Sequence, residues 1–333
     1  MTPGTKLEKQ KSFLEKIRYL LPPSMSYVDA LAEVLQLSTD SIYRRIRGET
    51  SMTIDELAKV CRHYRLSFDS LIDCDSAAVT FNHSQVAPGI TSFKNDYLRS
   101  ILEELILLSK ADNTNIIYIA DDIPIFHLFA FPELASFKMY YWMKSVLNVP
   151  EYQNQKYSFE NCDGEIVEIG KKMMDVYATV PSIEIWTEFT VNSLRKQIEY
   201  YSEAGFFENS SDAALICDQA AELILYVNSL ADRSTKLPGH GSRNFTMYYS
   251  EIEIGNNCIL VNVNNMSRVY LTYNTFNKIS TANQKFCDET KTWINYLISK
   301  SNLISGVSEK QRLQFVNKML EQFKDTRKKI EAG

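Results

Sequence analysis

The stretch STDSIYRRIRGETSMT, residues 38–53, contains the side chains best suited to binding an anionic partner. Three arginines fall within four positions, at Arg44, Arg45 and Arg47. A guanidinium group donates several hydrogen bonds in a fixed planar geometry, which matches phosphate oxygens and the major-groove edge of guanine. Arginines are also common on the solvated face of ordinary helices, so this spacing alone leaves both interpretations open.

A helical wheel divides the stretch into two faces. Ile42 and Ile46 define the buried side. The opposite face carries polar side chains of the types that read base edges and nearby phosphates. They are Thr39, Asp40, Tyr43, Arg44 and Arg47. Arg45 lies closer to the flank, and we predict that it contacts the DNA backbone. The same role is expected of Lys6, Lys9 and Lys11.

A set of short helices must hold this face outward. Helices are predicted over residues 7–21, from Ser26 to Leu35, over 39–47, from Thr53 onward, and from Ser67 to Ile72. Serines precede several of these helices as N-caps, and Thr53 and Glu56 form a capping box. Only the short segment LQLS separates the second helix from the third, which is the helix-turn-helix arrangement.

Residues 10–72 resemble the Xre/Cro/lambda-repressor-like family of helix-turn-helix regulators. The resemblance rests on ALAEVLQLS, on the turn before Ser38, and on TIDELAKVCRHYRLSFDSLI. It implies that the helix over 39–47 enters the major groove of DNA. The sequence departs from the family at Gln36, where Gly is frequent, at Val28, where Gln is frequent, and at Ile46, which takes the apolar position instead of Arg45.

Composition indicates a folded chain, and its length indicates two or more domains. The chain has 333 residues, 45% hydrophobic, with a net charge of −5. Basic residues slightly outnumber acidic ones over residues 1–72, whereas acidic residues dominate the remainder. The six cysteines have no C-x-x-C spacing, and neither a signal-peptide core nor a run of about 18 apolar residues is evident. We therefore expect a cytoplasmic protein with free thiols and no membrane partner.

The rest of the chain is predicted to be a mostly helical α+β domain. We assign residues 1–73 to the DNA-binding domain, 74–92 to a linker and 93–333 to an effector or dimerisation domain. Helices are expected over 93–110, in two pieces within 125–147, on either side of Pro181, and over 210–234, 282–300 and 308–330. TNIIYIA, residues 114–120, reads as a buried strand. Alternating residues over 244–273, with turns at 255–257 and 264–266, predict a three-stranded antiparallel meander.

Features that could indicate an enzyme are weak. His240 and Ser242 occupy a loop beside glycines, which is more often a plain turn. Asp121 and Asp122 follow a strand, where helix capping is the commoner role than ligand binding. Cys61 has no recognisable partner ligands, and no common catalytic or nucleotide-binding motif is present. We therefore expect no catalytic activity, no metal and no cofactor.

Two segments of the second domain have two interpretations each. The aromatic residues within 126–142 are either core or the walls of a ligand pocket, with core favoured. The helix over 93–110 has one apolar stripe, which serves either the core or a partner subunit.

The sequence as a whole predicts a one-component transcription regulator that binds a palindromic operator as a homodimer and responds to a small-molecule or peptide effector. The alternatives are an adaptor that uses the same helices to bind protein, and an unrecognised enzyme in the C-terminal domain.

Overall fold

The computed structural model describes residues 7–18, 26–64, 78–83, 86–238 and 242–332. Several predictions fall on residues outside these ranges. They concern Lys6, Pro22-Pro23, the helix from Ser67, residues 74–77 of the linker, and His240. The chain forms two compact units, which are residues 1–82 with 281–286, and residues 83–280 with 287–333. The sequence-based domain boundaries stay predictions, because the first falls within residues 65–77.

The first unit contains helices that match the predicted ones over its described residues. They are α1 (Glu8–Arg18), α2 (Tyr27–Leu35), α3 (Thr39–Ile46) and α4 (Ile54–His63). Their apolar sides meet in one small core. Its buried members are Phe13, Leu14, Ile17, Leu31, Leu35, Ile42 and Val60. Ser26 and Ser38 accept the capping hydrogen bonds, and the capping box of Thr53 and Glu56 is present as predicted.

The second unit is built on a mixed, mostly antiparallel sheet of eight strands in the order β1-β7-β6-β5-β2-β3-β4-β8. The strands are β1 (Asn82–His83), β2 (Thr114–Ala120), β3 (Ser182–Trp186), β4 (Phe245–Tyr249), β5 (Cys258–Val263), β6 (Met266–Tyr273), β7 (Asn277–Thr281) and β8 (Asn302–Leu303). Strands β2, β3 and β4 run parallel to one another, and β5 pairs antiparallel with both β2 and β6.

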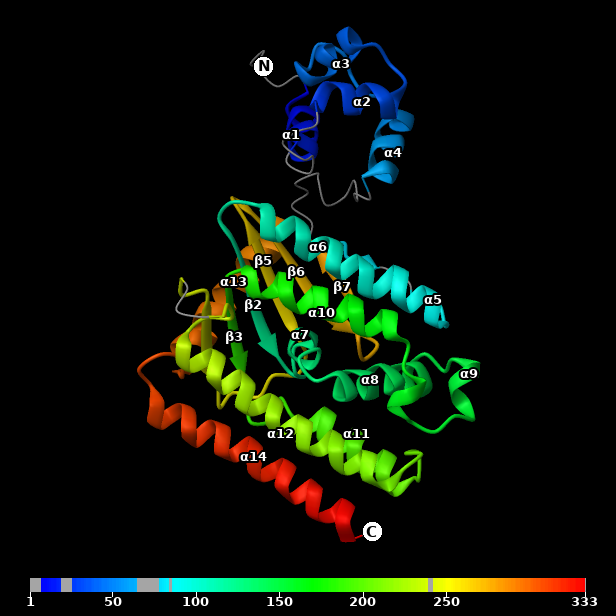
Figure 1. The fold of residues 1–333 in the computed structure, drawn as a ribbon. Helices are drawn as coiled ribbons and strands as arrows, with labels where there is room; N and C mark the ends of the chain where they lie inside the picture. The colour runs from blue at the N-terminus through cyan, green and yellow to red at the C-terminus, as the bar shows by residue number, and fades with distance from the viewer. Residues whose placement is uncertain (1–6, 19–25, 65–77, 84–85, 239–241, 333) are drawn as a thin grey trace. The chain divides into compact units, whose positions relative to one another are not determined.

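Helices pack around this sheet (Figure 1). The longer ones are α6 (Arg99–Lys110), α8 (Pro132–Tyr141), α10 (Gly164–Thr179), α11 (Asn192–Glu203), α12 (Ser210–Arg233), α13 (Gln284–Ser299) and α14 (Glu309–Ala332). The shorter ones are α5 (Ile90–Ser92), η1 (Phe93–Leu98), α7 (Ile125–Leu128), η2 (Trp142–Val146), α9 (Pro150–Gln153) and η3 (Phe159–Asn161). Helix α6 lies beside α10, and α12 lies beside α14.

The predicted three-stranded meander over 244–273 is wrong, although the broad α+β class holds and the chain is 59% helix. Residues 264–266 do form a hairpin turn between β5 and β6, with Asn264 in the left-handed conformation. Residues 255–257 do not form one, because β4 pairs with β3 and β8 whereas β5 pairs with β2 and β6. Alternation identified these strands but carries no information about their neighbours.

Strand β3 was also missed, because the sequence predicted helices on both sides of Pro181. β3 begins directly after that proline, and its short apolar run is buried in the middle of the sheet. Glu184 is fully buried at its centre. Its carboxylate accepts hydrogen bonds from Tyr177 Oη at 2.6 Å and Trp186 Nε1 at 2.8 Å, and His127 Nε2 lies 2.8 Å away. A charged residue at such a position makes a buried strand look like an exposed helix.

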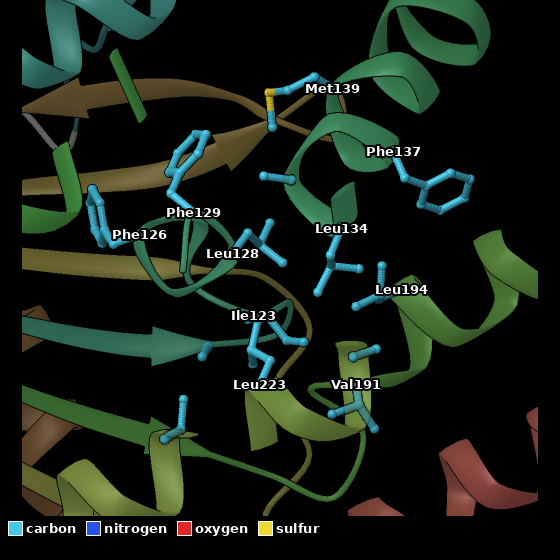
Figure 2. Close-up of a cluster of buried hydrophobic side chains, with 14 of the residues drawn as sticks. Ile123, Phe126, Leu128, Phe129, Leu134, Phe137, Met139, Val191, Leu194 and Leu223 are labelled. Carbon is cyan, nitrogen blue, oxygen red and sulfur yellow. The ribbon is translucent and has the colours of Figure 1, made fainter. Parts of the chain in front are cut away.

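Most of the aromatic segment 126–142 belongs to the core, as favoured from the sequence. Figure 2 shows Leu128 of α7 and Leu134 of α8 converging with Leu194 of α11 and Leu223 of α12, all of them buried. Helix α12 is long and apolar enough to span a membrane by length and composition. Its apolar side is buried against α14, α11 and α8, as in a core helix.

The close approach of α10 to α7 gives a test of this packing. A Cβ atom added at Gly170 would lie 2.0 Å from Cδ1 of buried Phe129. We expect Gly170→Ala to lower the free energy of unfolding by about 1–3 kcal/mol, because the ring must move within a packed core. Gly164→Ala in the same helix has no heavy atom within 4 Å and serves as the control. Urea unfolding followed by tryptophan fluorescence measures this unit, which contains all three tryptophans; equal midpoints for both variants would contradict the packing.

Candidate nucleic-acid interface

The turn between α2 and α3 is made without glycine. Gln36 adopts the left-handed conformation, with φ 56° and ψ 45°, and its N–H donates toward the carbonyls of Ala32 and Glu33. The Leu37 N–H donates to the carbonyl of Ala32 at 3.1 Å. These bonds satisfy the carbonyls at the end of α2. Ser38 then accepts from the N–H of Ser41 and begins α3, so the turn has the length the sequence predicted.

The structure brings five of the six predicted site residues together on the exposed face of α3. They are Thr39, Asp40, Tyr43, Arg44 and Arg47. Ile42 is buried on the opposite side, and Tyr43 is 48% exposed, which is high for a tyrosine. The wheel therefore gave the correct orientation of this helix. Because side chains on this face are not used in the core, they are available to a partner.

Carboxylates hold both exposed arginines. Arg44 Nε lies 3.6 Å from Asp40 Oδ2, one helical turn earlier, and Arg47 Nε donates to Glu49 Oε1 at 2.7 Å. The hydrogen bond from Arg47 lowers the pKa of the Glu49 carboxyl. Exposed pairs of this kind contribute little to stability, so an arginine can exchange its carboxylate for another acceptor at small cost.

Arg45 is placed differently from its neighbours. Its Nε and Nη2 donate to the two carboxylate oxygens of Glu56 at 3.1 and 2.7 Å, and its Nη1 donates to the Ser41 carbonyl at 3.1 Å. The two side chains are 14% and 16% exposed. The pair ties α3 to the first turn of α4. Its predicted contact with the DNA backbone stays a prediction, and it would have to compete with this pair.

Glu56 therefore has two tasks, since the same carboxylate also accepts from the Thr53 N–H at 2.9 Å. Partial burial acts to raise its pKa, but the hydrogen bonds from Arg45 and from the Thr53 N–H outweigh that effect and lower the pKa below the ordinary 4.5. The carboxylate is thus held in its charged form by both helices.

Gln10 of α1 is a positioning residue that sequence reasoning missed. Its Nε2 donates to the carbonyls of Arg45 and Thr50 at 2.8 and 2.9 Å, and its Oε1 accepts from the Met52 N–H at 2.8 Å. One side chain therefore fixes both ends of the loop that follows α3. A polar residue on a polar helix gives no sequence signal for such a role. Gly48 follows the C-cap of α3 with a φ of 73°, a conformation that glycine adopts without strain.

The basic residues of α1 are less informative. Lys9 and Lys11 are exposed, and their backbone contacts stay predictions. Within the residues that the structure describes, no three His, Cys, Asp or Glu side chains are grouped so that they could hold a metal ion.

Breaking the pair between α3 and α4 should loosen the first unit. We expect Arg45→Ala to lower the stability of α3 and α4 by about 1–3 kcal/mol, because it leaves a partly buried carboxylate without its partner. Arg44→Ala, the same change one residue away, should cost less than about 0.5 kcal/mol. Hydrogen exchange of peptides from α3 and α4 in the full chain measures both; equal protection in the two variants would contradict the role of Arg45.

The same pair predicts a pH dependence. Because the pKa of Glu56 is lowered in the folded state, its contribution to stability is complete above the ordinary value of 4.5 and is lost as the pH falls through the folded pKa. In the wild type, hydrogen-exchange protection of α3 and α4 should therefore decrease as the pH falls through the pKa of Glu56. Glu56→Gln should abolish the part of this decrease that comes from Glu56, because glutamine does not titrate. An unchanged pH profile in that variant would count against the pair.

Comparison with known proteins bears on this first unit. Residues 11–99 match the family model of the BetR domain, a helix-turn-helix-like DNA-binding domain family. No curated protein and no solved structure matches the chain. The matched region includes the whole exposed face of α3 and the Arg45–Glu56 pair, so DNA is the partner class that this region indicates.

Proposed function

We propose that this protein is a transcription regulator of the Xre/Cro-like type, which reads its operator by inserting α3 into the major groove. The observation that carries the proposal is the exposed face of α3, which combines two arginines, a tyrosine and two short polar side chains on one side of a capped helix. The BetR match over residues 11–99 supports DNA as the partner. The major groove is wide enough to admit an α-helix with its side chains.

Each exposed residue has a role that its chemistry suits. Arg44 and Arg47 fork onto guanine O6 and N7, and leave their carboxylate partners to do so. Thr39 and Tyr43 contact phosphate or a thymine methyl group. Asp40 either accepts from cytosine or holds Arg44 in place. Arg45 acts mainly through its pair with Glu56, which sets the angle of α3.

We further infer that the protein binds as a homodimer to a palindromic site. A single helix-turn-helix unit makes few base contacts, whereas two related by a two-fold axis read half-sites about 10 bp or a multiple of that apart. The second unit, residues 83–280 with 287–333, is large enough to supply the dimer interface and to sense an effector. In this proposal the protein acts in the cytoplasm by binding and not by catalysis.

Selection from a random duplex library tests the assignment. Wild-type full-length protein should enrich a two-fold-symmetric site, and Arg44→Ala/Arg47→Ala should enrich none. The control, Arg233→Ala/Lys328→Ala, removes two exposed charges from the second unit and should enrich the wild-type site. Enrichment of the same site by the α3 double variant would sink the role of α3. Enrichment by no protein would favour the adaptor or enzyme alternative.

Single variants separate base readout from positioning. Arg44→Ala should weaken binding to the selected site by about 1–3 kcal/mol and relax its sequence preference, because one bidentate base contact is lost. Arg45→Ala should weaken binding to every duplex alike, because it disturbs the whole helix. Fluorescence anisotropy on the selected and on scrambled duplexes at two salt concentrations measures this. Equal losses on all duplexes for both variants would overturn the two roles.

A further inference from the structure

The second unit contains a cavity of about 110 Å³ between its sheet and the segment formed by η1 and α6. Its floor comes from β2, β5 and β6, and its rim includes residues of β7. Tyr97, Ile101 and Leu105 line it from the helical side, and Tyr118 and Ile259 line it from the sheet. This mostly apolar lining favours the binding of an apolar ligand.

Hydrogen-bonding groups in this cavity lack protein partners. Tyr118 is 7% exposed and Trp142 is 6% exposed. Among the described residues, neither the Tyr118 hydroxyl nor the Trp142 indole N–H has a hydrogen-bond partner, whereas the neighbouring Tyr97 hydroxyl donates to the carbonyl of Phe276 at 3.0 Å. Among the described residues, the fully buried side-chain atoms that lack a hydrogen-bond partner are Arg195 Nε and Asn228 Oδ1. The Tyr118 hydroxyl and the Trp142 indole N–H are not among them, so both groups retain some exposure, and both side chains line the cavity. A molecule that enters the cavity can therefore bond to them.

Asn257 adds a third such group at the end of the cavity. Its Oδ1 accepts from the N–H groups of Asp121 and Asp122 at 2.8 and 3.0 Å, which fixes the orientation of the amide. The same side chain's NH₂ has no acceptor among the residues that the structure describes. Together the three side chains offer mainly donors, so they match a ligand that carries an oxygen acceptor.

The charges around the cavity are neutralised in pairs. Lys278 Nζ lies 2.7 Å from Glu104 Oε2, and Lys138 Nζ lies 2.7 Å from Asp122 Oδ2. Because each charged lining group already has its counter-ion, the cavity offers no unpaired charge to a charged ligand. A neutral ligand avoids the cost of burying a further charge.

Aromatic rings define the shape of the site. Phe276 stacks on Trp142 with ring centroids 5.0 Å apart, and Tyr97 meets Phe276 edge-on at 4.9 Å. The chain enters this cluster through a tight turn, in which the Phe276 N–H donates to the Asn274 carbonyl at 2.9 Å and Thr275 has a φ of 75°. A β-branched residue rarely adopts that conformation, and such outliers gather at ligand sites.

We propose that this cavity binds a neutral, single-ring aromatic compound that carries an oxygen acceptor such as a carbonyl. The aromatic and aliphatic walls contact the ring, and the Tyr118 hydroxyl and its neighbouring donors bind the oxygen. A cavity of about 150 Å³ holds benzene, so a volume of about 110 Å³ that opens toward solvent limits the enclosed part to one ring. Binding at this site needs no DNA, so the site and the proposed regulator function can fail independently.

Acetophenone is the probe for the test, with binding measured on the full-length protein by ligand-observed NMR titration. It should bind more tightly than ethylbenzene, which lacks the acceptor, and than benzoate, which is charged. Tyr118→Phe should weaken acetophenone binding about tenfold and leave ethylbenzene binding unchanged, because it removes one hydrogen bond to the ligand. That variant loses no hydrogen bond within the described protein, so its fold should be preserved.

Two further variants complete the test. Ile259→Trp places a larger side chain on the cavity floor and should abolish binding of both acetophenone and ethylbenzene. Tyr226→Phe makes the same chemical change as Tyr118→Phe outside the cavity lining and should bind like the wild type. Circular dichroism confirms the fold of each variant. Unchanged acetophenone binding in Ile259→Trp, equal weakening in both tyrosine variants, or no binding up to the solubility of the probe would overturn the proposal.

Discussion

The bidentate pair between Arg45 and Glu56 is the interaction on which the exposed face of α3 depends. Helix α3 has only eight residues and one fully buried side chain, Ile42, so its own apolar contacts fix its rotation weakly. The pair supplies a second fixed point on the flank, and Gln10 supplies a third at the loop that follows. Contacts at Ile42, at Arg45 and at the loop after α3 together determine the orientation of this short helix. The orientation of the exposed face is therefore set by contacts within the unit, and a face oriented in advance has a smaller ordering cost on binding.

This arrangement separates two groups of arginines that look alike in the sequence. Arg44 and Arg47 are paired with carboxylates in exposed positions, where water and salt weaken the pairs. Arg45 is paired where little water reaches, so its contact persists. Neighbouring arginines thus differ in role: Arg44 can change its hydrogen-bonding partner at small cost, whereas Arg45 joins α3 to α4. The helix period alone decides which is which, but only the structure shows the carboxylate that Arg45 meets.

Signals from neighbouring residues predicted the helix caps and a buried strand correctly. They failed where the structure depends on contacts with a distant part of the chain. The caps at Ser38 and Thr53 and the buried strand over 114–120 follow from neighbouring residues, and the structure has them. Glu56 was recognised as a cap but not as the partner of Arg45, because the pair joins two helices. Likewise, the alternation of apolar residues located β5 but did not show that β2 pairs with it. Strand β3 was missed because the partners of Glu184, His127 and Tyr177, lie on other elements, so the sequence does not show that this charged residue is buried.

The cavity was foreseen only in part, for the same reason. The sequence raised an aromatic pocket over 126–142 and favoured core, and most of that segment is core; Phe126 and Trp142 nevertheless line the cavity. Its other walls come from η1, α6 and β2, and from β5 and β6, which lie more than a hundred residues further along the chain, so no single stretch indicates it. Tyr97 lines the cavity and also falls within the BetR match over residues 11–99, so the match extends from the first unit into the second. A ligand could influence that region only by binding two of its conformations with different affinity.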